Sequence, residues 1–490
     1  ENSYTNSPNL SYSISEDISE GKIQLTRSGG KADPNSPHIV IMNEASRKKG
    51  VFVDYVFSEL KWVDGASYDL SINGSDQAGN KSKELMFKNI YYDTTVPVIF
   101  IDKISNNMHI NKETLSYSLS ETLLEGTLSF SQIGGETDSR SPQVVEFNNA
   151  ELKMGNFIQK QLGNGPSLVN GAVYDITFTG SDLAENEAIP INISNVSFDN
   201  QPPKMSISRP IDSEQIKTTI ISYMSNEALE EANVIFEQTS GTIDVNSPHK
   251  IPLTGDMLTS GVHSDFDLGI TSQLADGGRY SVTISAFDKA GNLVNITPIN
   301  DVFFDLLPPT LSLSAPESGS FINSPTVSYS TSEEMGKGRI VFTRTGGKED
   351  PKSPYDIVLT GARLKQGEHY FESFDSDIQL KDGSVYTIEF SGEDIAGNIA
   401  VNVSIKDIFY DTSVPEIVLN NPESNGFYNP ITLNYSLNEP LFSGKIRFEY
   451  TSGISDPMSP HDVSLSGIQL TAGQKTGINI NALMNLVSNA

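Results

Sequence analysis

Acidic side chains recur at fixed positions along this chain, and they are the residues best suited to chemistry. An Asp-x-Ala-x-Asn motif begins every 106 residues, at Asp76, Asp182, Asp288 and Asp394. A second aspartate precedes a proline at the same interval, at Asp93, Asp199, Asp305 and Asp411. A glutamate follows a tyrosine by four positions at Glu16, Glu121, Glu227, Glu333 and Glu439. The chain has no cysteine, which excludes a thiolate site, so this pattern favours an oxygen-bound hard cation.

The constant interval indicates about five copies of one unit. A Ser-Pro step shares it, with prolines at Pro37, Pro142, Pro248, Pro354 and Pro460. The predicted repeats 1 to 5 are residues 1–93, 94–199, 200–305, 306–411 and 412–490. By this count repeat 1 lacks its first strand and repeat 5 its last two strands. Either the sequence is a piece of a longer array, or another chain completes the ends by strand addition.

Each copy has the pattern of short strands and polar turns. In repeat 4, alternating or β-prone runs predict seven strands, with a Gly-Gly turn at Gly346–Gly347. The expected strands are 311–314, 327–332, 339–343, 356–359, 369–374, 386–391 and a last one running to Tyr410. No segment shows a sustained helical period. The predicted fold class is all-β, a tandem array of seven-stranded immunoglobulin-like β-sandwich domains.

One tyrosine position supports this topology. Tyr68, Tyr174, Tyr280 and Tyr386 follow an Asp-Gly or Asn-Gly turn (or the equivalent Asp-Gly-Gly) at the start of the sixth strand. We expect their hydroxyls to bond back across the corner of the sandwich, although an ordinary strand tyrosine would give the same sequence. The aspartates before the Ser-Pro steps are expected to cap their own turns or, less favourably, to contact the next linker; these are Asp33, Asp138, Asp244, Asp350 and Asp456.

The order of strands in a sandwich brings acids from neighbouring copies together. The last strand ends beside the following copy, where the turns after its second and sixth strands lie. Three carboxylates that converge repel one another unless a cation lies among them, and calcium suits such a set. The predicted groups are Asp93 with Glu121 and Asp182; Asp199 with Glu227 and Asp288; Asp305 with Glu333 and Asp394; and Asp411 with Glu439, whose third member falls beyond residue 490.

The alternative is turn chemistry alone. Asp-x-Ala-Gly-Asn is a favourable hairpin turn, and an aspartate before proline also caps a turn. If a cation is bound, Asn186, Asn292 and Asn398 are candidate carbonyl ligands. Repeat 2 departs from the motif because Glu185 replaces glycine, so Glu185 either adds a ligand or strains the turn.

The bulk composition and charge restrict the classes of partner. The formal net charge is −29 and the pI is about 4.5, which disfavours nucleic acid and anionic membranes and attracts cations, although solubility alone would explain it. No apolar stretch is long enough to span a bilayer, and no signal peptide begins the sequence.

These motifs together resemble the bacterial immunoglobulin-like repeats of giant surface adhesins and biofilm-associated proteins. The resemblance is carried by the segment from Phe287 to Asn292, by the segment from Tyr92 to Pro97, and by Ser120-Glu121. It covers essentially the whole chain. It implies a rigid extracellular stalk on the bacterial surface, stiffened by Ca²⁺ at the junctions between repeats.

Three kinds of function remain open on sequence alone. The first is this stalk or filament segment, whose partners are neighbouring repeats. The second is an array that binds glycan or protein, which the single tryptophan, Trp62, supports poorly. The third is a surface-layer or sheath lattice with lateral or homo-oligomeric contacts. An enzyme is disfavoured, because the position of His38, His249 and His461 is Gln143 in repeat 2 and Tyr355 in repeat 4.

Overall fold

The computed structural model describes residues 2–161, 165–428 and 430–480, and the fold is all-β. Apart from strands, this part of the chain contains short 3-10 helices. They are η1 (Ala45–Arg47), η2 (Gly255–Leu258), η3 (Gly361–Leu364) and η4 (Gly467–Leu470). Among the described residues, no helix has the length and apolar character needed to cross a bilayer.

Contacts between residues divide the chain into two compact units. The first comprises Glu1–Glu214 and Thr218–Phe304, and the second comprises Gln215–Lys217 and Asp305–Ala490. The finer division into five repeats stays a prediction, and repeats 1 to 5 denote the sequence ranges given above.

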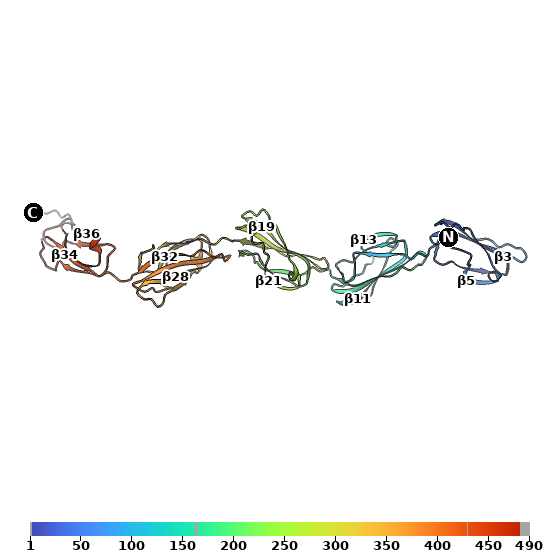
Figure 1. Cartoon of the computed structure of the whole chain (residues 1–490), viewed down its shortest axis with the longest axis horizontal. Helices are drawn as coiled ribbons and strands as arrows, with labels where there is room; N and C mark the ends of the chain where they lie inside the picture. Colours follow the sequence, from blue (N-terminus) through green and yellow to red (C-terminus); the bar gives the residue numbers. More distant parts are fainter. Residues whose placement is uncertain (1, 162–164, 429, 481–490) are drawn as a thin grey trace. The chain divides into compact units, whose positions relative to one another are not determined.

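Repeat 2 shows the sandwich in full (Figure 1). One sheet has the order β13-β10-β8 and the other the order β12-β11-β14-β15-β9. The strands are β8 (Ile99–Asp102), β9 (His109–Ile110), β10 (Thr114–Leu119), β11 (Leu123–Gly135), β12 (Gln143–Glu146), β13 (Gly155–Gln161), β14 (Ala172–Asp182) and β15 (Ile191–Phe198). Alternate residues of both sheets are buried between them, with Tyr117, Leu128 and Phe178 at 2%, 0% and 0% exposure. This period-two burial is the physical basis of the alternating sequence pattern.

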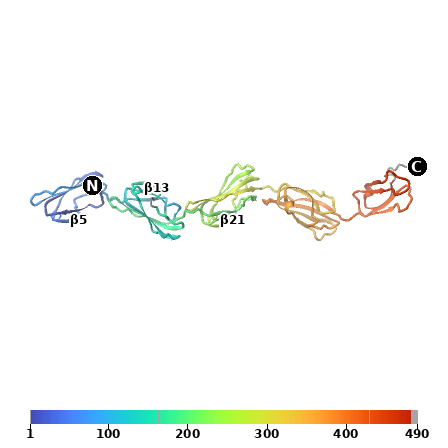
Figure 2. The same ribbon diagram turned by 180° about the vertical axis from the view of Figure 1, so that it is seen from behind.

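Repeats 3 and 4 repeat this arrangement, seen from behind in Figure 2. In repeat 3 the strands are β16 (Met205–Arg209), β17 (Gln215–Ile216), β18 (Ile220–Ser225), β19 (Leu229–Gly241), β20 (His249–Pro252), β21 (Gly261–Asp267), β22 (Gly278–Asp288), β23 (Leu293–Asn295) and β24 (Ile299–Phe304). In repeat 4 they are β25 (Leu311–Ala315), β26 (Phe321–Ile322), β27 (Thr326–Thr331), β28 (Met335–Gly347), β29 (Tyr355–Val358), β30 (Gly367–Ser373), β31 (Ser384–Asp394) and β32 (Val403–Tyr410).

In each of repeats 1 and 5, one sheet of the described residues has only two strands. Repeat 1 pairs β2 with β5 and orders the other sheet β1-β7-β6-β3-β4, whereas repeat 5 has the sheets β33-β34-β37 and β35-β36. Their strands are β1 (Ser3–Thr5), β2 (Asn9–Ile14), β3 (Ile18–Gly30), β4 (His38–Ile41), β5 (Gly50–Val56), β6 (Ala66–Asp76), β7 (Leu85–Tyr92), β33 (Ile417–Asn421), β34 (Thr432–Leu437), β35 (Gly444–Phe448), β36 (His461–Leu465) and β37 (Gly473–Asn479). The predicted end of repeat 5 extends into residues 481–490, outside the described residues.

The seven strands predicted for repeat 4 are confirmed, with two differences. The first strand is divided, because the chain leaves β25 and adds the two-residue β26 in parallel to β32 of the other sheet. The predicted Gly-Gly turn is wrong: Gly346 and Gly347 lie within β28 and pair with β31. Gly347 has φ +67, and a Cβ there would lie 2.3 Å from the carbonyl oxygen of Gly383. Close backbone approach therefore requires this glycine.

The short first-strand segments hold the start of each linker. The amide of Asp93 donates to the carbonyl of Thr5 in β1, and the amide of Asp199 donates to that of Ile110 in β9, at 3.0 and 2.9 Å. Asp305 and Asp411 bond in the same way to Ile216 and Ile322, each at 2.9 Å. The backbone position of every linker aspartate is thus fixed by its hydrogen bond to the end of such a segment.

The predicted tyrosine corner is confirmed. The hydroxyl of Tyr68 accepts a hydrogen bond from the amide of Val63 at 3.0 Å and donates to Asp33 Oδ2 at 2.9 Å. The same pair of contacts holds for Tyr174, Tyr280 and Tyr386. Asp33 also accepts from the amide of Asn35, so the predicted turn cap is confirmed as well. Burial alone would raise the pKa of Asp33, but hydrogen bonds from His38 and Tyr68 outweigh it, and the pKa is lowered.

Candidate metal centre

Three carboxylates converge at three places in the described chain. Within each group, one oxygen per residue lies within 4.8 Å of the other two. Site 1 consists of Asp93, Glu121 and Asp182; site 2 of Asp199, Glu227 and Asp288; and site 3 of Asp305, Glu333 and Asp394. The structure therefore brings together the three complete trios expected from the sequence, while their role as metal ligands stays a prediction.

Strand pairing explains why the glutamate and the motif aspartate meet. Leu123 at the start of β11 is paired with Asp182 at the end of β14. The turn between β10 and β11, which holds Glu121, therefore lies beside the end of β14. The same pairing joins Leu229 with Asp288 and Met335 with Asp394.

Turn capping and convergence occur together, so the two interpretations of the sequence are not exclusive. Asp182 Oδ1 accepts hydrogen bonds from the amides of Ala184 and Asn186 at 2.7 and 2.9 Å. The linker aspartates also cap, because Oδ1 of Asp93 accepts from the amide of Thr95 at 3.0 Å. Oδ1 of each other linker aspartate likewise accepts from the backbone amide two residues later in the chain. The distances are 3.1, 3.2 and 3.0 Å for Asp199, Asp305 and Asp411. These bonds aim the carboxylates without neutralising their charge.

The motif asparagine links the turn directly to the linker. Asn186 Nδ2 donates to the carbonyl oxygen of Asp93 at 2.9 Å and to Asp182 Oδ2 at 2.8 Å. Asn292 and Asn398 donate in the same way to the carbonyls of Asp199 and Asp305, at 2.8 and 2.9 Å. The sequence predicted that the side-chain carbonyl oxygen of these asparagines would bind a cation. In the structure it is the side-chain amide nitrogen that faces the linker, where it donates hydrogen bonds. In Asn292, Oδ1 also already accepts a bond from Asn111 at 3.1 Å.

The electrostatics of sites 1 and 2 are those of crowded anions. Burial and then the neighbouring charges of Asp182 and Asp64 raise the pKa of Asp93. Burial and then Asp93 and Asp182 raise the pKa of Glu121. The pKa of Glu227 is raised by burial and by Asp199 and Asp288. A bound cation would relieve this repulsion more effectively than a proton.

The donor set fits calcium. Calcium takes oxygen ligands at about 2.3–2.6 Å in flexible geometry, so two ligands of one ion lie at most about 5 Å apart. The 4.8 Å limit within each trio meets this condition. Backbone carbonyls and water would complete a shell of six to eight ligands. Site 3 differs because Lys217 Nζ donates to the carbonyl of Gly397 in the adjoining turn, so a fixed positive charge lies close by.

The fourth predicted group is represented by two residues. Asp411 and Glu439 both line a hollow of about 610 Å³. Oε1 of Glu439 is buried without a hydrogen-bond partner among the described residues. A buried, unpaired carboxylate oxygen is costly, and a cation would satisfy it.

Removing divalent cations is expected to make the stability of the junctions depend on pH. The pKa values of Asp93, Glu121 and Glu227 are higher in the folded than in the unfolded chain, so folding favours their protonated forms. Their stabilising contribution is therefore present below about pH 4 and is lost as the pH rises through the raised pKa values. Melting in chelator between pH 4 and 7 would measure it. The doubly substituted variant Glu121→Gln, Glu227→Gln should show a flatter profile. A profile unchanged by these substitutions would contradict the prediction.

Glu185 strains the turn in repeat 2, as one of the two sequence-based alternatives predicted. Its φ is +65, where the equivalent Gly79, Gly291 and Gly397 have φ +86, +86 and +88. The side chain is exposed, and Glu185 is not in the trio of site 1. We expect Glu185→Gly to stabilise repeat 2 by up to about 1 kcal/mol, measured by hydrogen exchange of β14. Destabilisation in calcium alone would instead identify Glu185 as a ligand.

One acid near the sites was missed by the sequence reasoning. Asp64, in the Asp-Gly turn before Tyr68, raises the pKa values of both Asp93 and Glu121. Asp64 and its counterpart Asp382 also accept hydrogen bonds from their linkers. The signal was present, because aspartate or asparagine recurs before Gly65, Gly171, Gly277 and Gly383, but it was interpreted as turn chemistry only.

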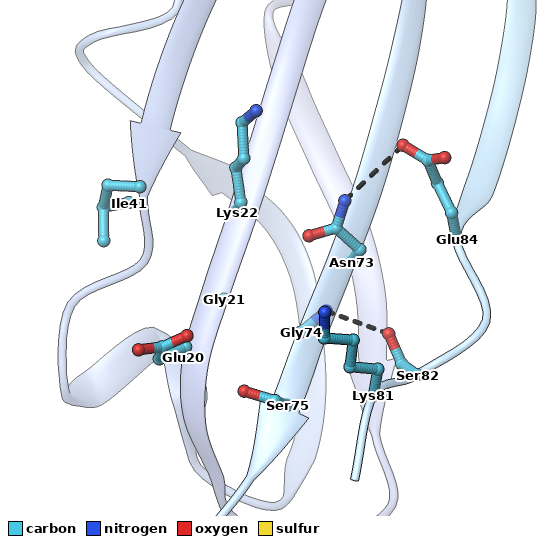
Figure 3. A pocket seen from close by; sticks show the side chains of 10 residues that line it. All are labelled: Glu20, Gly21, Lys22, Ile41, Asn73, Gly74, Ser75, Lys81, Ser82 and Glu84. Carbon is cyan, nitrogen blue, oxygen red and sulfur yellow. Dashed lines mark hydrogen bonds between the residues drawn. The ribbon is translucent and has the colours of Figure 1, made fainter. Parts of the chain in front are cut away.

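A hollow in repeat 1 contains no comparable group of carboxylates (Figure 3). Its volume is about 620 Å³, and its polar groups bond one another: Asn73 Nδ2 donates to Glu84, and the amide of Gly74 to Ser82. In the corresponding hollow of repeat 2, Thr127, Glu187 and Ala188 replace Lys22, Lys81 and Ser82, so the basic side chains do not recur. Sites 1 to 3 are therefore the recurring chemical feature.

The histidines and the tryptophan have structural contacts. His38 and His249 each bond an aspartate of the corner at 2.7 Å. Trp62 packs against Tyr68 and Tyr92, with ring centroids 5.3 and 5.5 Å apart. It therefore packs against the core of repeat 1, which argues against its use as a stacking platform for sugars.

Comparison with family models gives a match to part of the chain. Residues 51–207 match the family described as bacterial Ig-like domain (group 3), which confirms the predicted resemblance. The chain is similar to a solved tetra-tandem repeat in the extending region of a large adhesion protein, with 18% identity, 84% of this chain and 97% of that chain covered, and a TM-score of 0.26. Fibronectin(III)-like modules of Clostridium thermocellum CbhA match at 17% identity, 42% and 94% coverage and a TM-score of 0.23.

Chicken CNTN1 FN1–FN3 domains match at 12% identity, with 64% and 100% coverage and a TM-score of 0.23. TM-scores of this size carry no argument. No curated protein sequence matches the chain.

Proposed function

Since residues 51–207 match bacterial immunoglobulin-like domains, we propose that this chain is a stalk or filament segment of a large bacterial cell-surface protein, stiffened by Ca²⁺ between repeats. The proposal places it outside the cell and gives it no enzymatic role. The observation that carries it is the recurrence of a carboxylate trio made from a linker aspartate and two acids of the following repeat.

The proposed mechanism follows from where the three ligands lie. One belongs to the linker, and the other two belong to turns anchored in the next sandwich. A cation that binds all three ties the linker to that sandwich at a second point. The first point is the hydrogen bond from Asn186, Asn292 or Asn398 to the linker carbonyl. Two points of attachment restrict a hinge that one point leaves able to rotate.

Two alternatives lead to different observations. A lattice role predicts side-to-side association of chains in solution. An array that binds glycan predicts an exposed aromatic at one position in every copy, and Trp62 is partly buried in a single copy. The stalk is favoured because the feature that recurs is at the linkers.

Small-angle scattering of the whole chain in calcium and in chelator tests the proposal. We expect chelation to broaden the distribution of dimensions and to lower the melting transitions. A variant with Glu121→Gln, Glu227→Gln and Glu333→Gln should bind calcium more weakly, so that its scattering in calcium shifts towards that of the parent in chelator. Scattering that is identical in both conditions would exclude calcium stiffening, and concentration-dependent growth in mass would favour the lattice.

A further inference from the structure

The linkers fall into two classes that differ in how many prolines they contain. Linkers 1 and 4 read Asp93-Thr94-Thr95-Val96-Pro97 and Asp411-Thr412-Ser413-Val414-Pro415, with one proline and two hydroxyl residues. Linkers 2 and 3 begin at Asp199 and Asp305, have two consecutive prolines, and have no hydroxyl residue between aspartate and proline.

In linker 1 the hydroxyl residues are held by a carboxylate of the preceding repeat. Asp64 Oδ1 accepts bonds from the amide and the hydroxyl of Thr94, at 2.6 and 2.9 Å. Asp64 Oδ2 accepts from the hydroxyl of Thr95 at 3.0 Å. These bonds lower the pKa of Asp64, the largest effect being that of the Thr94 amide, so the clamp is anionic at neutral pH.

Linker 4 repeats this contact in a different sequence context. Asp382 Oδ1 accepts from the amide and the hydroxyl of Thr412, at 2.8 and 3.1 Å. The hydroxyl of Ser413 lies 3.4 Å from Oδ2. The bond from the Thr412 amide and then that from Lys348 lower the pKa of Asp382 to about 2. The two clamps therefore share donors, acceptor and charge.

In linker 2 the corresponding residue is Asn170. Its Oδ1 accepts one bond, from the amide of Asn200 at 2.9 Å. Asn200 and Gln201 carry no hydroxyl, and Pro202 stands where linker 1 has Val96. Proline fixes its own φ and restricts the residue before it, so it stiffens a linker without any partner.

We propose that Asp64 and Asp382 are cation-independent linker clamps that take the place of the second proline. Each linker of this chain is thereby restrained before any metal binds, by a carboxylate holding two hydroxyl residues or by Pro-Pro. Asp64 and Asp382 are positioning residues, since they orient the linker that carries Asp93 or Asp411. This inference does not depend on the proposed calcium sites.

The test measures linker freedom in chelator, where bound metal cannot contribute. The chain has no cysteine, so pairs of introduced cysteines can carry spin labels without background. Ala32→Cys with Glu125→Cys spans linker 1, and Thr137→Cys with Glu231→Cys spans linker 2; all four residues are exposed. Pulsed electron paramagnetic resonance on the whole chain then gives the distribution of distances between the two spin labels on either side of each linker.

Asp64→Asn is expected to broaden the distribution across linker 1, because the loss of charge-assisted bonds to both threonines raises the open fraction about fivefold. Asparagine occupies the equivalent position in repeat 2, so the substitution is compatible with the fold. Thr95→Val should broaden it less. Adding Val96→Pro to Asp64→Asn should restore the narrow distribution, since Val96 is exposed and its proline counterpart is Pro202.

Asn170→Ala is the matched control, and we expect no change across linker 2. An unchanged distribution in Asp64→Asn would overturn the clamp. The proposal that the clamp takes the place of the second proline would be overturned by either of two results. One is that Val96→Pro does not restore the narrow distribution across linker 1, and the other is that Asn170→Ala broadens the distribution across linker 2. Because every measurement is made in chelator, none of these outcomes depends on whether calcium binds sites 1 to 3.

Discussion

Replacing Glu227 with glutamine is expected to stabilise repeat 3 slightly in chelator and to destabilise it in calcium. In the metal-free protein Glu227 is held near Asp199 and Asp288, and its pKa is raised by burial and by both charges. Removing its charge relieves that repulsion. In calcium the same substitution removes a charged ligand, and a tenfold loss of affinity lowers the stability of a saturated site by about 1.4 kcal/mol.

This substitution is informative because its effect on the stability of repeat 3 is expected to have opposite signs in chelator and in calcium. Hydrogen exchange of β22, measured with and without calcium, resolves repeat 3 from the other repeats. Glu237→Gln changes the net charge of the same repeat by the same amount, at an exposed position of β19. It should have one small effect of constant sign. If Glu227→Gln also changes the stability of repeat 3 in the same direction in both conditions, the trio is a set of repelling carboxylates and not a metal site.

The sequence was sufficient to predict the trios because each acid has a fixed place in a regular topology. Glu121 follows β10, Asp182 ends β14, and Asp93 follows β7, so the order of strands alone brings them together. No side-chain detail was needed. The same reasoning holds for the corner tyrosines, whose place follows from the start of the sixth strand.

What the sequence did not predict depends on contacts of one or two residues. The segment β26 is two residues long and has no alternation to detect. The Gly346–Gly347 pair looks like a turn, yet the glycine is required by close approach to Gly383 within a sheet. The hydrogen bonds that Asp64 accepts from Thr94 join residues 30 positions apart, and a local Asp-Gly turn explains the same sequence equally well. Such contacts depend on the folded geometry and not on periodicity.

The position of the motif asparagine was predictable from the sequence, but its hydrogen bonding was not. Its spacing predicted that Asn186 lies at the junction, and it does. Which atom faces the linker was not predictable, because an amide offers an acceptor and two donors. The structure uses the donors, towards the carbonyl of Asp93 and the carboxylate of Asp182. The asparagine therefore binds the linker even when no cation is present.

Tyr280→Phe is expected to destabilise repeat 3 by about 2–4 kcal/mol, with or without calcium. The hydroxyl donates to Asp244 Oδ2 at 2.7 Å and accepts from the amide of Ala275 at 2.8 Å. Tyr280 is fully buried and the side chain of Asp244 is 3% exposed. The substitution leaves a buried carboxylate oxygen and a backbone amide each short of a partner, and buried groups without partners cost more than the bonds contribute.

His249→Gln is the matched control, because glutamine occupies this position in repeat 2 and Gln143 Nε2 donates to Asp138 there. Its effect should be well below that of Tyr280→Phe. The pKa of Asp244 is lowered, since hydrogen bonds from His249 and Tyr280 outweigh the effect of burial. Its contribution to stability is therefore present above the unfolded pKa of about 3.8 and is lost as pH falls, opposite to the carboxylates of sites 1 and 2. Hydrogen exchange of β22 in Tyr280→Phe measures the effect, and protection equal to that of the parent would show that water replaces the hydroxyl and that the corner does not stabilise the repeat.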